Sequence, residues 1–258
     1  MKIGIIGGGA MGGGLARGLI NGNHIQAENI TIANPHTEKL EDLAVAGVNV
    51  TENNDAAVKG VDLIVFAVKP WILPDVVKKV AADIDASGQE VCAIVAGVSS
   101  SDLRSWFGEN LPERFSISMP NTAMSVSESM TFLVNINGDC PLAKKVFDKL
   151  GKTDIVAESK LDAGMALASC GMAFAMRYVR AACEGGVELG FRASEAQRIV
   201  AQTLKGAVKL LEQSESHPEV EIDKVTTPGG ITIRGLNAME RAGFTNAVIE
   251  GLLTAAGR

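Results

Sequence analysis

A glycine-rich turn near the N-terminus constrains the fold of this chain more than any other feature. Residues 2–6, apolar after Lys2, are followed by Gly7, Gly9 and Gly12 in the spacing G-x-G-x-x-G, and a helical pattern begins at Ala10. In such a turn the first glycine permits the tight bend, the second lets the backbone approach a pyrophosphate, and the third allows close packing of helix on strand. The exposed N–H groups and the helix dipole favour an anion. Strand, turn and helix together predict a dinucleotide-binding unit.

The end of the second predicted strand bears on the choice of dinucleotide. Sites selective for NAD usually end this strand in Asp or Glu, which bonds the ribose hydroxyls, whereas here the strand ends in Asn34. A carboxylate would repel a 2′-phosphate, while Asn34, Thr37 and Lys39 could accept one. The sequence therefore favours NADP(H), with NAD(H) as the alternative. Ordinary roles are also open, since Asn34-Pro35 can form a turn and Thr37 can cap a helix.

Short apolar runs alternate with helical patterns up to about residue 157. The expected strands are residues 2–6, 29–33, 48–50, 62–67, 90–95 and 115–119, and residues 131–134 and 153–156 could extend the sheet at one edge. This alternation predicts a parallel sheet covered on both faces. The expected fold class is α/β, with a Rossmann-type doubly wound sheet in residues 1–157 followed by an all-helical domain in residues 158–258.

The second half of the chain has a different composition. Residues 161–190 and 194–213 are rich in Ala and Leu and contain no proline. The first segment is also rich in Met and is apolar on nearly every face. A helix that is hydrophobic all round needs cover on all sides, which fewer than 100 residues cannot easily supply. We expect a second copy of the chain to provide it, in a homodimer or a larger assembly. Packing against the sheet domain is the alternative.

Charge and cysteine usage limit the classes of partner. The 258 residues carry a net charge of −6, which argues against nucleic acid and anionic membranes. No stretch is apolar and long enough to span a bilayer, and from the first residues we expect no signal peptide. A metal site or disulfide framework is not expected, because the histidines do not cluster and no C-x-x-C spacing occurs. We expect a protein of the reducing cytoplasm with four buried cysteines, Cys92, Cys140, Cys170 and Cys183.

Further turns carry groups that could meet a ligand. The strand at residues 62–67 ends before Lys69 and Pro70, and ligands bind beyond the carboxyl ends of strands in open α/β sheets. Residues 95–99 and 118–122 end the next two strands with small or polar side chains, which suit the floor and wall of a nicotinamide site. Residues 226–232, TTPGGIT, precede another helical pattern. Their bare N–H groups and hydroxyls suit a small carboxylate, although a capped loop without a ligand would look the same.

Taken together, these motifs resemble the pyrroline-5-carboxylate reductase family, which performs the last step of proline synthesis. The resemblance spans nearly the whole chain and is carried by residues 7–12, Ala67-Val-Lys-Pro70, Met119-Pro-Asn-Thr122 and, most specifically, residues 226–232 through Glu240. It implies a two-domain oxidoreductase that reduces the cyclic imine 1-pyrroline-5-carboxylate to L-proline with NAD(P)H. It also implies a helical domain that interlocks into a dimer.

The resemblance implies roles for individual residues. The substrate carboxylate would lie against Thr227 and the Gly229 and Gly230 amides, and Thr232 is the candidate catalytic residue that orients the imine and relays a proton. The implied cofactor contacts are Gly7, Gly9, Ala10, Met11, Gly12, Asn34, Asn54, Ala67, Val68, Lys69 and Pro70.

One segment departs from the family pattern. Where the family usually carries Ser-Gly-Ser-Gly-Pro-Ala-Tyr, residues 168–174 are ASCGMAF, without the proline and the phenol. This segment lies near the nicotinamide in the family, so substrate and rate stay open at this point. Two other functions remain: a 3-hydroxy-acid dehydrogenase, and an NADP(H)-binding protein without turnover. The former needs a catalytic lysine in the helical domain, where Lys160, Lys205 and Lys209 lie in no recognisable motif.

Overall fold

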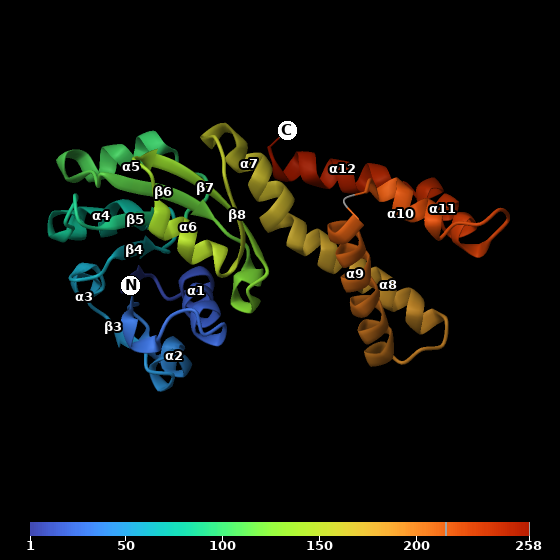
Figure 1. Ribbon diagram of the computed structural model, residues 1–258, viewed down its shortest axis with the longest axis horizontal. Coiled ribbons are helices and arrows are strands. Elements are labelled where there is room, and N and C mark those ends of the chain that lie inside the picture. Colours follow the sequence, from blue (N-terminus) through green and yellow to red (C-terminus); the bar gives the residue numbers. More distant parts are fainter. Residues whose placement is uncertain (215, 258) are drawn as a thin grey trace. The chain divides into compact units, whose positions relative to one another are not determined.

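The computed structural model describes residues 1–214 and 216–257 (Figure 1). The chain divides into two compact units, Met1–Ser169 and Cys170–Arg258. Each unit is described by itself. The division falls within a helical run that begins at Leu161, and the domain boundary at residue 157 stays a prediction.

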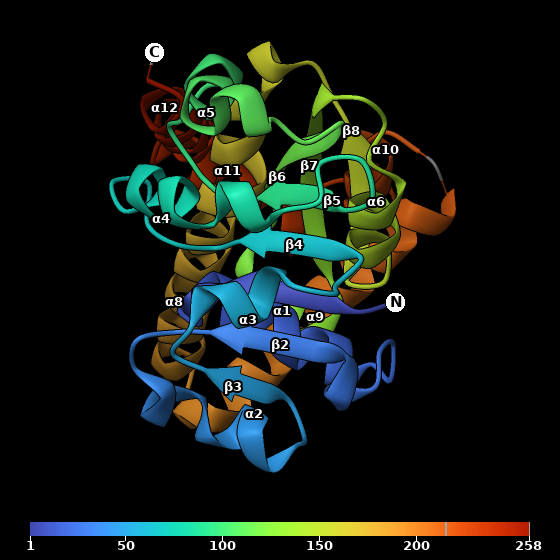
Figure 2. The ribbon, with the colours of Figure 1, turned by 90° about the vertical axis from the view of Figure 1, so that its left-hand side faces the viewer.

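An eight-stranded sheet forms the centre of the first unit (Figure 2). Its order is β3-β2-β1-β4-β5-β6-β7-β8, with β1 to β6 parallel, β7 antiparallel to β6, and β8 parallel to β7. The strands are β1 (Ile3–Ile6), β2 (Ile30–Ala33), β3 (Asn49–Thr51), β4 (Leu63–Phe66), β5 (Glu90–Ala93), β6 (Arg114–Met119), β7 (Ser129–Asn137) and β8 (Gly151–Ile155). The predicted α/β class is confirmed. The two strands expected as possible extensions of the sheet, at residues 131–134 and 153–156, are present as β7 and β8.

Helices cover both faces of this sheet, as the continuous apolar strands require. Within β4, Leu63 and Val65 join one core cluster while Ile64 and Phe66 join the other, because successive side chains of a strand point to opposite faces. The first cluster lies under α1 (Ala10–Asn21), α2 (Glu41–Val45) and α6 (Pro141–Asp148). The second lies under α3 (Asn54–Val58), α4 (Leu73–Val80) and α5 (Ser100–Phe107).

Short 3₁₀ helices make most of the remaining connections of the first unit. They are η1 (Ala27–Asn29), η2 (Thr37–Leu40), η3 (Ala81–Asp83), η4 (Gly108–Asn110), η5 (Thr122–Val126) and η6 (Glu158–Lys160). The residue before η2, His36, provides no side-chain cap, and Thr37 is the first residue of that helix. The alternative in which Thr37 caps a helix is therefore wrong.

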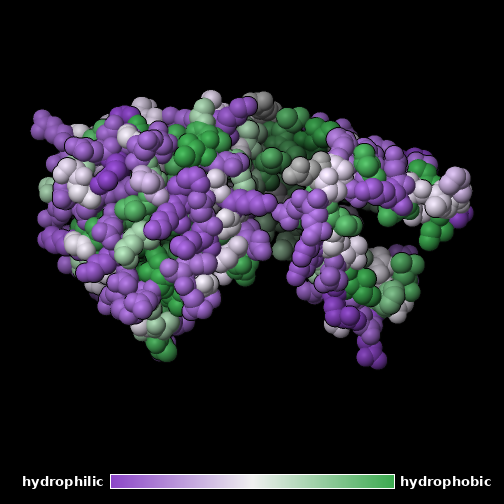
Figure 3. All heavy atoms as spheres, viewed as in Figure 1, coloured by the Kyte–Doolittle hydropathy of each residue, from purple (hydrophilic) through white to green (hydrophobic). Residues whose placement is uncertain are grey.

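The second unit is entirely helical over its described residues. The run that enters it consists of α7 (Leu161–Gly164), the π-helical segment η7 (Met165–Cys170) and α8 (Gly171–Glu188). It is followed by α9 (Ala193–Ser214), α10 (Pro218–Lys224), α11 (Ile231–Arg241) and α12 (Phe244–Ala255). Both long helices expected from the sequence are present. Among the described residues of this unit, Ala196 alone is buried, and Figure 3 shows apolar side chains at its surface.

The cysteines of the two units differ in how deeply they are buried. Cys92 and Cys140 are buried in the sheet unit, whereas Cys170 and Cys183 are only half-buried. The expectation of four buried cysteines is wrong for the latter two, because they lie in helices that a single chain leaves largely uncovered. No helix within residues 1–214 and 216–257 combines the length and apolar character needed to cross a membrane.

Candidate active site

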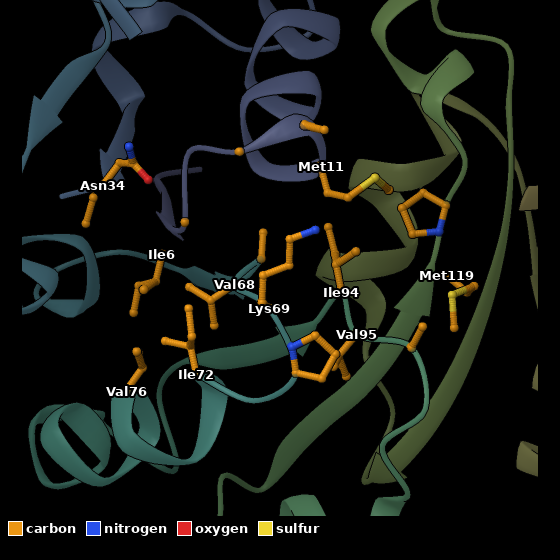
Figure 4. Close-up of a pocket in the computed structure, with 18 of the residues that line it drawn as sticks. Ile6, Met11, Asn34, Val68, Lys69, Ile72, Val76, Ile94, Val95 and Met119 are labelled. Atoms are coloured by element: carbon orange, nitrogen blue, oxygen red, sulfur yellow. The ribbon is translucent and has the colours of Figure 1, made fainter. Parts of the chain in front are cut away.

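A cavity of about 620 Å³ opens where the parallel strands of the first unit end (Figure 4). β1 lies between β2 and β4 in the sheet, so the chain adds β2 and β3 on one side of β1 and then crosses to add β4 on the other side. Ligands of open α/β sheets bind where the strand order reverses in this way. Ten of the eleven predicted cofactor contacts line this cavity: Gly7, Gly9, Ala10, Met11, Asn34, Asn54, Ala67, Val68, Lys69 and Pro70. The structure thus brings together residues spread over the first 70 positions.

The glycine turn has the geometry that a diphosphate needs. Gly7 has φ +105°, a conformation that L side chains rarely adopt. A Cβ on Gly12 would lie 1.9 Å from the Gly7 carbonyl oxygen, so Gly12 allows α1 to pack closely and does not line the cavity. A Cβ on Gly9 would meet nothing within 4 Å, which leaves open space in front of this backbone.

The N-terminus of α1 is free to bind an anion. Gly9 is its N-cap and provides no side-chain cap for the first N–H groups of the helix. The N-terminus of α5 is different, because the Glu158 carboxylate accepts hydrogen bonds from the backbone N–H and the hydroxyl of Ser100, both at 2.6 Å. The protein therefore supplies its own anion to α5 and leaves α1 for a ligand.

Asn34 ties the glycine turn to the loop that follows β2. Its Oδ1 accepts a hydrogen bond from the Gly8 N–H at 3.1 Å, and its Nδ2 donates to the His36 carbonyl at 2.8 Å. The strand end is neutral, as the sequence indicated. However, Glu52 also lines this end of the cavity, because β3 pairs with β2 and the Asn34 N–H donates to the Thr51 carbonyl at 2.9 Å.

The cavity has two chemically different ends. Figure 4 shows Asn34 at one end, with Ile72 and Val76 on the same side, and Met119 at the opposite end. The Lys69 side chain points into the space between them. Lys69 forms no ion pair with any described residue, so its charge is available to an anionic ligand.

The far end is built from the ends of β5 and β6 and from η7. Ile94, Val95 and Ala96 lie beyond β5, and residues 119–122 end or follow β6. Of the two segments expected as floor and wall, residues 97–99 and 118 do not line the cavity. Met165 and Ser169 of η7 also line the cavity. Ser169 belongs to residues 168–174, which the family resemblance places near the nicotinamide. Met165 was not predicted, because nothing local predicts a π-helical segment or the side of the sheet on which it packs.

The predicted substrate residues lie in the second unit, in the turn between α10 and α11. Gly230 is the N-cap of α11 without a side-chain cap, and its N–H donates to the Thr227 carbonyl at 2.9 Å. The Thr226 hydroxyl donates to the Ile222 and Asp223 carbonyls, both at 3.2 Å. In contrast, the hydroxyls of Thr227 and Thr232 are exposed and have no partner among the described residues.

Gly229, with φ +71°, is also exposed in this turn. The turn lines no cavity of the first unit. Its substrate role and the catalytic role of Thr232 stay predictions, although the two free hydroxyls and the uncapped helix fit a carboxylate.

Comparisons with known proteins match both halves of the chain to family models. Residues 158–258 match the family model for pyrroline-5-carboxylate reductase dimerisation, and residues 2–97 match that for NADP oxidoreductase, coenzyme F420-dependent. Pyrroline-5-carboxylate reductase 2 of Dictyostelium discoideum is 33% identical, with 99% of this chain and 91% of that protein covered. Reductase 1 of the same organism is 36% identical, and the chain spans only 48% of its length.

A solved structure agrees with the sequence relatives. The crystal structure of Plasmodium falciparum pyrroline carboxylate reductase with NADP bound has a TM-score of 0.88 and 26% identity, with 100% of this chain and 96% of that chain covered. Coverage of the whole chain means that the similarity includes both units. The chain therefore belongs to the pyrroline-5-carboxylate reductase family.

Proposed function

We propose that this chain reduces the cyclic imine 1-pyrroline-5-carboxylate to L-proline, with NADPH as the hydride donor. The observation that carries this function is the cavity built around the uncapped N-terminus of α1, within a chain whose full-length relatives are named pyrroline-5-carboxylate reductases. A similar protein of known structure holds NADP.

The cavity residues fit the parts of NADPH in order. Ile72 and Val76 suit the adenine ring beside Asn34, and the N–H groups after Gly9 suit the diphosphate, with the Lys69 ammonium nearby. The small residues Val95 and Ala96 leave room for the nicotinamide at the opposite end. When bound, NADPH supplies a hydride, that is, a proton with an electron pair.

The protein's own part in the reaction is positioning. Hydride adds to the imine carbon and a proton to the ring nitrogen, so the C=N bond becomes a C–N single bond with no side chain consumed. A protonated imine is already electrophilic, and the main requirement is a fixed geometry without water. Thr227 and the Gly229 and Gly230 amides would hold the carboxylate, and the Thr232 hydroxyl would orient the nitrogen and relay its proton.

An assay of NADPH oxidation with 1-pyrroline-5-carboxylate tests this function. Rapid consumption of NADPH with formation of proline is the expected result. A 3-hydroxy-acid dehydrogenase would instead reduce NADP⁺ when given a 3-hydroxy acid. A binding protein would retain NADPH without turning over either substrate, and this outcome would exclude the reductase function.

We also propose that the chain works as a homodimer or a larger assembly, in the cytoplasm. The match of residues 158–258 to a dimerisation model supports the assembly, as does the burial of Ala196 alone among the described residues of the second unit. The half-buried thiols of Cys170 and Cys183 suit a reducing compartment.

A further inference from the structure

We propose that Asn121 is a positioning residue, which holds the π-helical segment η7 against the nicotinamide end of the cavity. The role rests on the proposed function, since it concerns the end of the cavity opposite Asn34, where the nicotinamide would lie. Asn121 is only 6% exposed and lies two residues after the end of β6.

The side-chain amide of Asn121 joins two elements. Its Oδ1 accepts a hydrogen bond from the Ala123 N–H at 3.0 Å and so caps η5. Its Nδ2 donates to the Ala168 carbonyl in η7 at 3.3 Å. The backbone N–H of Asn121 donates to the Ser129 hydroxyl at 3.1 Å, which fixes the residue to β7. The residue is therefore held by the sheet while its amide holds η7.

The segment η7 needs such support. π-helical turns are rare and occur mostly as single-turn bulges inside α-helices, frequently at functional sites. One side of the run is close-packed, since a Cβ on Gly164 would lie 2.7 Å from the Phe132 ring. On the cavity side, the described polar contacts to η7 are the Asn121–Ala168 hydrogen bond and a longer one from the Ser169 hydroxyl to the Pro120 carbonyl at 3.4 Å.

The position of η7 sets the shape of the far end of the cavity. Met165 and Ser169 line it on either side of the Ala168 carbonyl in the sequence, so the Asn121 amide acts between the two lining residues. Hydride transfer requires reacting atoms about 3 to 3.5 Å apart, and a misplacement of about 1 Å can cost on the order of a hundredfold in rate. Loss of the bond should therefore reduce kcat, while the adenosine end stays intact.

Two substitutions separate the bond to η7 from the cap of η5. Asn121→Asp and Asn121→Ser both keep an oxygen acceptor suited to an N-cap, and neither keeps an amide donor to the Ala168 carbonyl. We expect kcat to fall about tenfold in both, the size of a lost positioned hydrogen bond. KM for NADPH should stay within about threefold, because the cavity residues around Asn34 are unchanged. A purely structural role would instead lower the Tm and the active fraction and leave kcat per folded enzyme unchanged.

Asn137→Asp is the matched control. Asn137 lies on β7 and its Nδ2 donates to the Pro112 carbonyl at 2.8 Å, yet neither residue lines the cavity. This variant loses an equivalent amide donor and should keep the kcat of the parent enzyme. Parental kcat in both Asn121 variants, or an equal loss of kcat in the control, would overturn the proposal.

Hydrogen exchange tests the role independently of any turnover. In the full-length protein without substrate, the amides of residues 165–170 should exchange about tenfold faster in the Asn121 variants, while those of α1 keep their protection. Unchanged exchange at residues 165–170 would overturn the proposal, whatever the substrate proves to be. Absence of 1-pyrroline-5-carboxylate reduction by the parent enzyme would instead contradict the proposed function alone.

Discussion

Glu52 introduces a carboxylate where the cofactor preference is decided. The residue after β2 is the neutral Asn34, but the pairing of β3 with β2 brings Glu52 to the same end of the cavity. A carboxylate there disfavours the 2′-phosphate of NADPH and can accept hydrogen bonds from the ribose hydroxyls of NADH. We therefore expect a weaker preference for NADPH than Asn34 alone indicates.

Neutralising Glu52 should strengthen the preference for NADPH. We expect Glu52→Gln to raise the ratio of kcat/KM for NADPH to that for NADH about three- to tenfold, a size suited to an exposed charge pair. Glu38→Gln is the control, because Glu38 is exposed, lies 3.4 Å from the His36 ring nitrogen and does not line the cavity. Steady-state kinetics with both cofactors measure the ratio, and an unchanged or lower ratio in Glu52→Gln would contradict this role.

Thr232 is the residue to which a proton relay is assigned. Its hydroxyl has no partner among the described residues, so its removal breaks no internal hydrogen bond. We expect Thr232→Ala to lower kcat/KM about ten- to a hundredfold with little change in Tm. Thr245→Ala is the control, since its hydroxyl donates to Glu240 at 2.7 Å outside the threonine-glycine turn. Full kcat/KM in Thr232→Ala would remove this residue from the mechanism.

The residues that the sequence predicted for the cavity belong to local motifs. Gly7, Gly9 and Asn34 follow directly from a strand end and its turn, so short-range reasoning finds them. Glu52 and Met165 reach the cavity only through tertiary packing, of β3 on β2 and of η7 beside residues 120 and 121. Spacing in the sequence carries no signal for such neighbours. Gly12 was assigned to the cofactor, whereas its close contact is with the Gly7 carbonyl.

At the scale of elements, a buried carboxylate anchors α6 to the sheet. Glu90 begins β5, is fully buried, and accepts hydrogen bonds from the Ala143 N–H at 2.6 Å and the Leu142 N–H at 3.0 Å. These N–H groups belong to the first turn of α6, where Pro141 lacks one. An acidic residue at the start of an apolar strand predicts none of this, because its partners are about 50 residues away in the sequence.

Removing this anchor should destabilise the sheet unit. Glu90→Ala leaves one buried and one partly buried N–H group without a partner, so we expect a loss of about 2–3 kcal/mol in the free energy of unfolding. Denaturant titration measures this loss. Asp102→Ala is the comparison, because Asp102 is exposed and also accepts from a helix-end N–H, that of Ser99 at 3.0 Å. An equal loss of unfolding free energy in both variants would show that the burial of the Glu90 carboxylate does not increase its contribution to stability.

Glu90 also gives stability a pH dependence. Burial raises the pKa of Glu90, although hydrogen bonds from Ala143 and Leu142 and the nearby Arg114 act in the opposite direction. A folded-state pKa above the unfolded one means that the folded protein binds the proton more tightly. Its contribution to stability is therefore full below the ordinary glutamate pKa and is lost as pH rises through the raised value. Glu90→Gln has no carboxyl at this position and therefore lacks this pH-dependent contribution to stability.

Thermal unfolding between about pH 4 and pH 7 measures that difference. The Tm of the parent protein relative to Glu90→Gln should fall as pH rises. A constant difference across this range, or one that grows in favour of the parent protein, would show that the pKa of Glu90 is not raised. Both proteins retain Arg114 and the exposed acidic residues, so contributions common to the two cancel in the comparison.

The elements themselves were largely predictable. Short apolar runs and helical spacing predicted six strands and both long helices, and residues 131–134 and 153–156 were expected as possible edge strands. The π-helical turn η7 was not predictable, since residues 165–170 fit an ordinary helix and the bulge depends on neighbours such as Asn121. Exact edges also differ by a few residues, as in the strand expected at residues 131–134, which extends over Ser129–Asn137.

At the scale of the whole molecule, the second unit has too little core to be stable alone. A domain of about 100 residues normally buries a hydrophobic core, yet Ala196 alone is buried among the described residues after Ser169. Apolar residues such as Phe244, Val248, Ile249 and Leu253 of α12 are exposed in the single chain. Large exposed apolar surfaces mark sites of protein association. The match of this unit to a dimerisation model indicates that another copy of the chain covers them.

The mass of the protein in solution tests whether another copy of the chain covers these apolar residues. A charge placed on α12 should disrupt such an interface. Light scattering should give the mass of two or more chains for the parent protein. Val248, 44% exposed in the single chain, would be desolvated between subunits, so Val248→Glu buries an unpaired charge and should yield single chains with a lower Tm. Val45→Glu is the control, since Val45 of α2 is 84% exposed and should tolerate the charge. A parent mass equal to one chain, or an unchanged mass in Val248→Glu, would contradict an interface through α12.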